Sequence, residues 1–85
     1  MRYSLEFTAS ALKEFQTLDR QIQRRVTEKV KALCEDPFPS GVKELRGEVD
    51  HFRIRVGDYR IVYRMDGSRV VIVIVRIGHR REVYR

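Results

Sequence analysis

The fold is decided by residues 51–77, HFRIRVGDYRIVYRMDGSRVVIVIVRI, because they contain three strand-like segments joined by two turn signals. Apolar and polar side chains alternate along residues 51–56 and 59–65, which is typical of half-buried strands. Gly57-Asp58 separates these two segments, and Asp66-Gly67 is a type I′ hairpin signal. The last segment is apolar on both faces, as a central strand is. The stretch therefore predicts an antiparallel three-stranded meander.

Two-residue loops in both hairpins would fix which side chains share a face. Arg55 then lies opposite Arg60, and Tyr63 lies opposite Val70. The face away from the apolar core would carry Arg53, Arg55, Arg60, Val62, Arg64, Arg69, Val71, Val73 and Val75. Directly opposed like charges are destabilising unless something negative lies between them. Arg55 and Arg60 therefore predict an anion site, whereas Arg64 and Arg69 fit a solvated surface equally well.

The first half of the chain predicts one strand and two helices. Residues 2–7 alternate as a half-buried strand does. Apolar residues at helical spacing follow in two stretches, the first capped by Thr8 or Ser10 and the second by Asp19. Pro37 ends the second helix, because proline disfavours helix in the residue before it.

These elements predict a single domain over residues 1–85 with an α+β fold. The expected order is β-α-α-β-β-β, with an antiparallel sheet of about four strands and both helices on one face. Residues 37–41 read as a loop, and residues 42–50 as a connector without clear periodicity.

The net charge of +6 is unevenly distributed along the chain. Residues 1–50 hold nine basic and nine acidic residues, whereas residues 51–85 hold nine arginines, no lysine and three acids. Lysine is the usual solubilising cation, and arginine is favoured where a planar fork grips phosphate or carboxylate. The second half therefore predicts binding to a nucleic acid or to an acidic protein.

Several classes of protein are not expected from this composition. Cys34 is the single cysteine, so a disulfide framework is excluded, and its helical apolar setting favours an inert core thiol. One cysteine and two distant histidines predict neither a metal site nor a cofactor. The N-terminus lacks a signal-peptide core and the longest apolar run is too short to span a bilayer, so we expect a cytoplasmic protein without membrane contact.

The C-terminal segment is expected to lie beside the opposed arginines. The last strand runs back toward Gly57, and Gly78 permits an abrupt turn. His79, Arg80 and Tyr84 would then fold across the arginine face, so that distant stretches of sequence form one basic patch.

Four segments together carry a resemblance to a known family: KELRG (43–47), FRIRVGDYRIVYR (52–64), the valine-rich strand and IGHRREVYR (77–85). They resemble the RelE family of the RelE/ParE toxin superfamily, over nearly the whole chain. The resemblance implies a type II toxin that enters the ribosomal A site and cleaves mRNA by attack of a 2′-hydroxyl on the adjacent phosphate. It also implies a co-expressed antitoxin that is acidic and folds on binding.

The resemblance also implies roles for individual residues. Arg60, Arg80 and Tyr84 match catalytic positions, and Arg53 and Arg55 match basic positions that would bind RNA. We add Arg46 and Arg81 as RNA-binding candidates and His79 as a catalytic candidate. Tyr84, with its pKa lowered by cations, and His79, which titrates near neutrality, are both candidates for proton transfer, and the sequence leaves the base and the acid open.

Two other functions fit the same sequence. The first is a ParE-type toxin, which shares the fold but inhibits DNA gyrase. The second is a non-catalytic, arginine-faced module that only binds RNA. The valines between the arginines also leave two alternatives. They form either an interface for a partner rich in acidic and aliphatic residues or a surface covered by the chain's own C-terminal segment.

Overall fold

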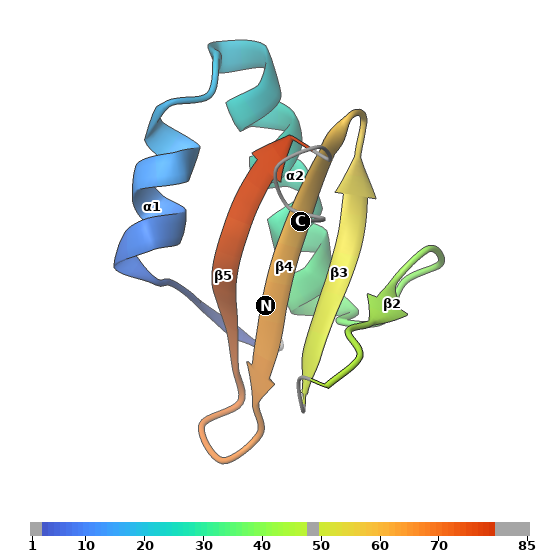
Figure 1. Cartoon of the computed structure of the whole chain (residues 1–85). Helices are drawn as coiled ribbons and strands as arrows, with labels where there is room; N and C mark the ends of the chain where they lie inside the picture. Colours follow the sequence, from blue (N-terminus) through green and yellow to red (C-terminus); the bar gives the residue numbers. More distant parts are fainter. Residues whose placement is uncertain (1–2, 48–49, 80–85) are drawn as a thin grey trace.

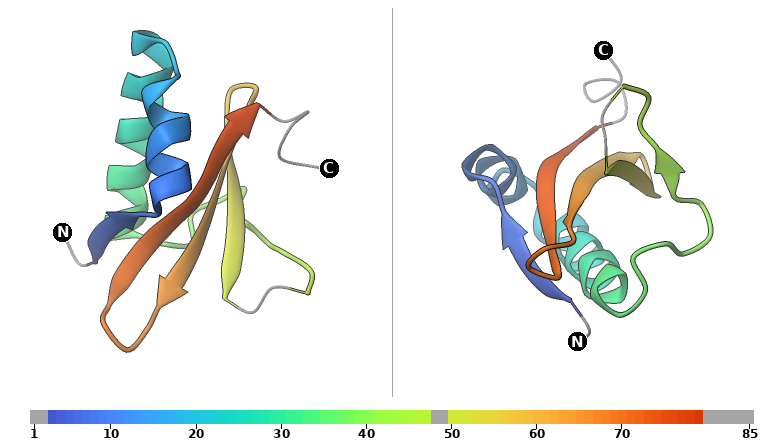
Figure 2. Two further views of the ribbon diagram at one scale, coloured as in Figure 1. Left: turned by 60° about the vertical axis from the view of Figure 1, so that its left-hand side comes forward. Right: turned by 90° about the horizontal axis from the view of Figure 1, so that it is seen from below.

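Five strands and two helices make up the computed structural model, which describes residues 3–47 and 50–79 (Figure 1). In chain order they are β1 (Ser4–Phe7), α1 (Ala9–Gln16), α2 (Arg20–Glu35), β2 (Lys43–Glu44), β3 (His51–Val56), β4 (Tyr59–Asp66) and β5 (Val71–His79). The sheet order is β1-β5-β4-β3-β2, and both helices cover one face (Figure 2). The α+β fold with both helices on one face is thereby confirmed.

The sheet differs from the expected one in two details. It has a fifth strand, β2, a two-residue segment in the connector that pairs with β3. The sheet is also mixed, because β1 runs parallel to β5 while the other pairs are antiparallel. A two-residue strand is too short to leave a periodic signal, so sequence alone does not reveal β2.

Both helices begin at the residues that the capping pattern predicts. The Thr8 hydroxyl oxygen accepts the Ala11 N–H at 3.1 Å, and an Asp19 carboxylate oxygen accepts the Ile22 N–H at 3.0 Å. Thr8 also donates its hydroxyl to the Val75 carbonyl at 3.2 Å, which fixes the start of α1 against β5. Within residues 3–47 and 50–79, neither helix has the length and apolar character needed to cross a bilayer.

Tyr63 lies at the centre of the core and joins the sheet to the loop after α2. Its side chain is fully buried, and its hydroxyl donates a hydrogen bond to the Pro37 carbonyl. Burial, assisted by the nearby Asp36 carboxylate, raises the pKa of Tyr63 to about 12. Cys34 is also fully buried and burial raises its pKa, so the thiol is the inert core residue that its setting predicts.

The register of the first hairpin is confirmed. Val56 pairs with Tyr59, Ile54 with Ile61 and Arg55 with Arg60. Gly57 has a φ of 59°, a conformation that side chains with a Cβ rarely adopt, and it begins the turn between β3 and β4.

The predicted register of the second hairpin is wrong, because its loop is longer than two residues. Asp66 pairs with Val71, so residues 67–70 form the connection. The Asp66 carboxylate accepts hydrogen bonds from the Ser68 hydroxyl and from Arg69 Nε, both at 2.8 Å. Aspartate commonly organises a turn through its side chain in this way, and here it overrides the Asp-Gly hairpin signal.

A β-bulge changes the faces of β5 after the hairpin. Tyr63 pairs with Ile74, whereas Val62 pairs with Arg76, so Val75 is the extra residue. The bulge turns Ile77 into the core, where it is 1% exposed.

Val70 gives a prediction about stability, because it combines a β-branched side chain with a φ of 55°. That conformation costs a residue with a Cβ roughly 1–2 kcal/mol. Replacing valine by glycine removes this cost but opposes part of the gain, because glycine raises the conformational entropy of the unfolded chain by roughly 0.5–1 kcal/mol. The Val70 side chain is 49% exposed, so its loss removes little packing. Val70→Gly should raise the free energy of unfolding by about 0.5–1 kcal/mol, measured by urea denaturation.

Val71→Gly is the matched control for this prediction. Val71 begins β5 and is 5% exposed, so its removal should destabilise the protein. If Val70→Gly destabilises the protein as much as Val71→Gly does, residue 70 stores no strain.

Candidate functional site

Four cations from three adjacent strands line one hollow on the sheet face opposite the helices. Lys43 of β2 pairs with Arg53 of β3, and Arg55 of β3 pairs with Arg60 of β4. The hollow has a volume of about 210 Å³ and is lined by Gly41, Lys43, Arg53, Ile54, Arg55 and Arg60. We refer to it as the cationic hollow.

Backbone carbonyls of the β3–β4 turn hold two of these arginines. Arg55 Nε donates to the Gly57 carbonyl at 2.8 Å, and Arg60 Nη1 donates to the Tyr59 carbonyl at 3.4 Å. Each guanidinium has further N–H donors beyond these bonds. The turn therefore orients both side chains before any ligand binds, as a preorganised anion site requires.

The charges around the cationic hollow favour an anionic ligand. Its described lining residues include four cations and no acid. The ion pairs of Arg69 with Glu6 and Asp66, and of Arg76 with Glu14, lie outside this hollow. A phosphate group could accept hydrogen bonds from several of the grouped cations at once.

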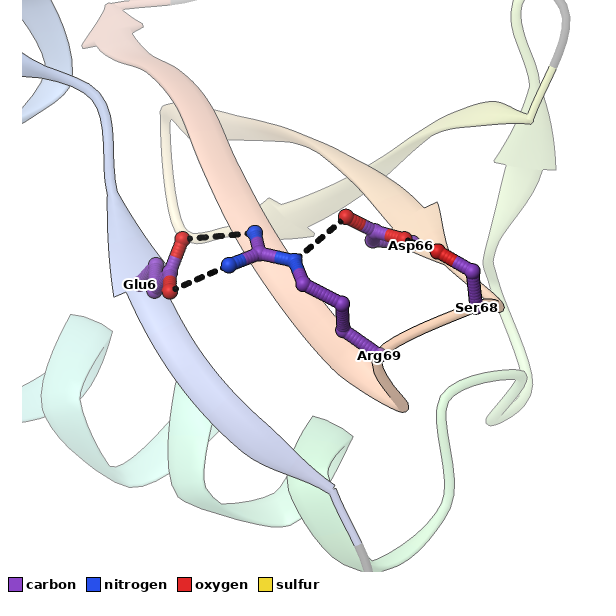
Figure 3. A network of polar contacts seen from close by, with 4 residues as sticks. All are labelled: Glu6, Asp66, Ser68 and Arg69. Atoms are coloured by element: carbon purple, nitrogen blue, oxygen red, sulfur yellow. Dashed lines mark hydrogen bonds and ion pairs between the residues drawn. The ribbon is translucent and has the colours of Figure 1, made fainter.

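Arg69 belongs to a different arrangement, shown in Figure 3. It donates to both Glu6 carboxylate oxygens, at 3.1 and 3.3 Å, and to Asp66 at 2.8 Å. The hydrogen bonds from Arg69 and Ser68 lower the pKa of Asp66 to about 2. Arg69 thus links β1 to the β4–β5 hairpin and is a structural residue.

Three valines of the arginine face are buried, so the predicted exposed apolar surface is wrong for them. Val62, Val71 and Val73 are 7%, 5% and 4% exposed. They lie on the inner strands β4 and β5, and the Arg69 side chain crosses β5 to reach Glu6 (Figure 3). The alternative, a surface covered by the C-terminal segment, falls on residues outside the described part of the chain.

His79 lies on the other face of the sheet from the cationic hollow. It pairs with Tyr59, and the two rings meet edge to face with centroids 5.6 Å apart. Both side chains line a hollow of about 390 Å³ against the end of α1, together with Glu14, Thr17, Leu18, Asp19, Ile77 and Gly78. The structure therefore does not bring His79 together with Arg55 and Arg60.

The other predicted site residues fall into two groups. Arg46 is exposed in the loop after β2 and is not among the residues that line the cationic hollow. Arg80, Arg81 and Tyr84 lie outside the described residues. Of the eight candidates, the structure thus brings together Arg53, Arg55 and Arg60.

Lys43 is a site residue that sequence reasoning missed. It faces the cationic hollow because β2 pairs with β3, placing Lys43 opposite Arg53. The sequence offers one signal, which is the position of Lys43 at the start of KELRG, but only the pairing shows where its side chain points.

Comparisons with known proteins match the chain to toxins of toxin–antitoxin systems. Residues 5–84 match the family described as the ParE toxin of the type II toxin–antitoxin system parDE. The chain is 36% identical over 87 residues to toxin RelG of Mycobacterium tuberculosis, covering 100% of this chain and 99% of RelG. It is 33% identical over 88 residues to the mRNA interferase toxin RelE of Escherichia coli, covering 99% and 92%.

A solved structure agrees with these sequence relatives. The chain superimposes on a chain of the RelBE2 toxin–antitoxin complex from Mycobacterium tuberculosis with a TM-score of 0.81. The sequence identity is 33%, and the alignment covers 94% of this chain and all of that one.

Lys43 provides a test of the cationic hollow. Lys43→Gln should weaken binding of a labelled single-stranded RNA and should lower the salt slope of the affinity by about 0.7, the value expected for one lost phosphate contact. Fluorescence anisotropy over a series of salt concentrations measures both. Lys13→Gln removes the same charge from α1 and is the control; an equal effect of the two variants would show that Lys43 contributes only net charge.

Proposed function

Because the chain belongs to the RelE/ParE superfamily of type II toxins, we propose that it is a ribosome-dependent endoribonuclease that cleaves mRNA in the A site. Two relatives that are each 33% identical to the chain are named mRNA interferases. Inhibition of translation in the cytoplasm is the expected result.

One observation carries the proposal, namely the cationic hollow. Arg53, Arg55 and Arg60 were assigned to RNA binding or catalysis by resemblance, and they line one hollow of about 210 Å³. A site of this size and charge suits a single phosphodiester better than it suits a protein surface. Its donors come from strands, so their positions are held firmly for catalysis.

The proposed reaction needs no co-reactant. The 2′-oxygen of one nucleotide attacks the adjacent phosphorus and the bond from phosphorus to the 5′-oxygen breaks, leaving a 2′,3′-cyclic phosphate and a free 5′-hydroxyl. The proton from the 2′-hydroxyl goes to a base, and an acid protonates the leaving 5′-oxygen. Arg55 and Arg60 would stabilise the extra negative charge on the phosphorane.

Proton transfer is assigned to groups other than these arginines, because a guanidinium hardly titrates. Tyr84 and His79 remain the candidates for base and acid. His79 packs against Tyr59 on the helix-covered face, which favours Tyr84 of the two.

A second candidate function follows from the description of the matching family. That family is described as ParE, and ParE-type toxins inhibit DNA gyrase. A supercoiling assay separates the two functions, since a ribosome-dependent nuclease leaves gyrase active.

The partner proposed for this toxin is an acidic antitoxin. A relative's solved structure is a toxin–antitoxin complex. With three of the valines buried, attraction would come mainly from carboxylates that bind the cationic hollow. Such a segment would fold as it binds and would compete with RNA for the same arginines.

We predict that Arg60→Ala and Arg80→Ala each reduce cleavage of ribosome-bound mRNA by about 100- to 1,000-fold, because each removes a donor to the developing charge. Arg60 is half-buried and faces away from the helices, so folding should be preserved. Primer extension on a translation mixture measures the cut positions and rates.

Arg64→Ala is the matched control for these variants. Arg64 is on the same strand and face as Arg60 but pairs with His51 and Val73, away from the hollow. Near-parental cleavage by Arg60→Ala would show that the site is elsewhere.

We predict that free mRNA is a very poor substrate, because in-line geometry must be imposed from outside the toxin. The same RNA should be cut at codon-phased positions only when ribosomes are present. Efficient cutting of naked RNA would instead indicate a self-sufficient ribonuclease.

The antitoxin prediction concerns residues 69–85. Binding of the antitoxin should slow amide hydrogen exchange in this segment, because the partner covers the arginine face and the C-terminal residues that follow β5. Exchange measured by mass spectrometry on the toxin and on its complex tests this. Equal protection in both would mean that the inhibitor binds elsewhere.

A further inference from the structure

A second hollow lies on the α2 side of the β3–β4 turn, and Arg55 lines both hollows. It has a volume of about 350 Å³ and is lined by Arg25, Glu28, Lys29, Ala32, Arg55, Val56 and Gly57. We refer to it as the helix-side hollow. Its position at the edge of the sheet makes it continuous, through Arg55, with the cationic hollow.

Two guanidinium groups meet at Gly57 from different elements. A Cβ atom on Gly57 would lie 3.4 Å from both Nη1 and Nη2 of Arg25 and 3.6 Å from its Cζ. The Nη end of the Arg25 guanidinium therefore lies close to the open side of Gly57, where a side chain would contact it. Arg55 Nε donates to the carbonyl of the same glycine at 2.8 Å. An arginine of α2 and an arginine of β3 thus both approach Gly57.

The donors of Arg25 are available to a ligand. Arg25 is exposed, and its guanidinium carries several N–H groups. In the part of the chain that the structure describes, the ion pairs are made by Arg69 and Arg76 and not by the cations of this hollow. Three cations and Glu28 leave the helix-side hollow with a net positive charge.

A solvated helix face explains these features less well. Lysine is the usual residue on such a face, whereas arginine is favoured where a planar fork binds phosphate. Arg25 lies beside Gly57, in the turn whose carbonyl binds Arg55. Successive cations along a surface are the electrostatic pattern of a polyanion site.

We infer that the helix-side hollow binds a second RNA phosphate, so that a bound RNA backbone passes round the β3–β4 turn with Arg55 between two phosphates. Arg25 and Lys29, which are one helical turn apart on α2, would contact this second phosphate. The identification of the anion as RNA rests on the proposed function. Messenger RNA and ribosomal RNA present the same phosphate chemistry to this site.

The test compares two double variants with equal changes in net charge. Arg25→Gln/Lys29→Gln removes the two cations of α2 from the helix-side hollow. Lys13→Gln/Arg20→Gln removes two exposed helical cations that line neither hollow. Binding is measured against salt concentration for a labelled single-stranded RNA and for ribosomes that carry mRNA, and urea denaturation checks folding of both variants.

The expected result is a salt slope lowered by about 0.7 or more and a binding affinity weakened by about tenfold for the first variant relative to the second. A loss on free RNA and on ribosomes assigns the phosphate to messenger RNA. A loss on ribosomes alone assigns it to ribosomal RNA. In both cases the inference is supported.

Other outcomes overturn the inference. One is an equal salt slope for the two variants in both assays, or no binding of the parent protein to either the free RNA or the ribosomes. Another is a lower cleavage rate at saturating ribosomes with an unchanged slope, which would make Arg25 a residue that only positions the turn. If the parent binds free RNA with the predicted slope change but does not cut mRNA on ribosomes, the proposed function fails while the phosphate site stands.

Discussion

The two-residue turn between β3 and β4 is the constraint on which the candidate site depends. Gly57 at φ 59° closes the turn and fixes the register that places Arg55 directly opposite Arg60. A slip of one residue in β4 relative to β3 would turn Arg60 to the core face and away from Arg55. The Gly57 carbonyl then binds Arg55, and the absence of a side chain on Gly57 leaves room for the Arg25 guanidinium nearby. One glycine therefore sets strand pairing, side-chain orientation and the approach of α2.

Sequence reasoning predicts most of the fold because its strongest signals are local. Thr8 and Asp19 cap their helices through bonds to residues three positions away, and Pro37 limits α2. The first hairpin is equally local. Arg53, Arg55 and Arg60 could thus be placed on one face from periodicity and turn length alone, which is the part of the site that the structure brings together.

The features that sequence missed depend on contacts between distant residues. The β4–β5 loop is longer than its Asp-Gly signal predicts, and its Arg69 binds Glu6, 63 positions away, as well as Asp66. The bulge at Val75 likewise coincides with the bond from Thr8 to its carbonyl. Neither contact leaves a periodic signal in the sequence. The sequence therefore does not predict the register of β5, the orientation of His79 or the burial of the valines.

Among the described residues, Arg55 differs in its physical role from Arg69 and Arg76. Arg69 and Arg76 have carboxylate partners on β1, the hairpin and α1, and they fasten the edges of the sheet. Arg55 instead binds a backbone carbonyl beside other cations, an arrangement that does not neutralise its charge. A protein selected only for stability would not group cations in this way. Under the proposed function, this grouping of cations would be the source of affinity for a polyanion. The same grouping would give an acidic antitoxin its strongest point of attachment, so activity and inhibition would depend on one set of charges.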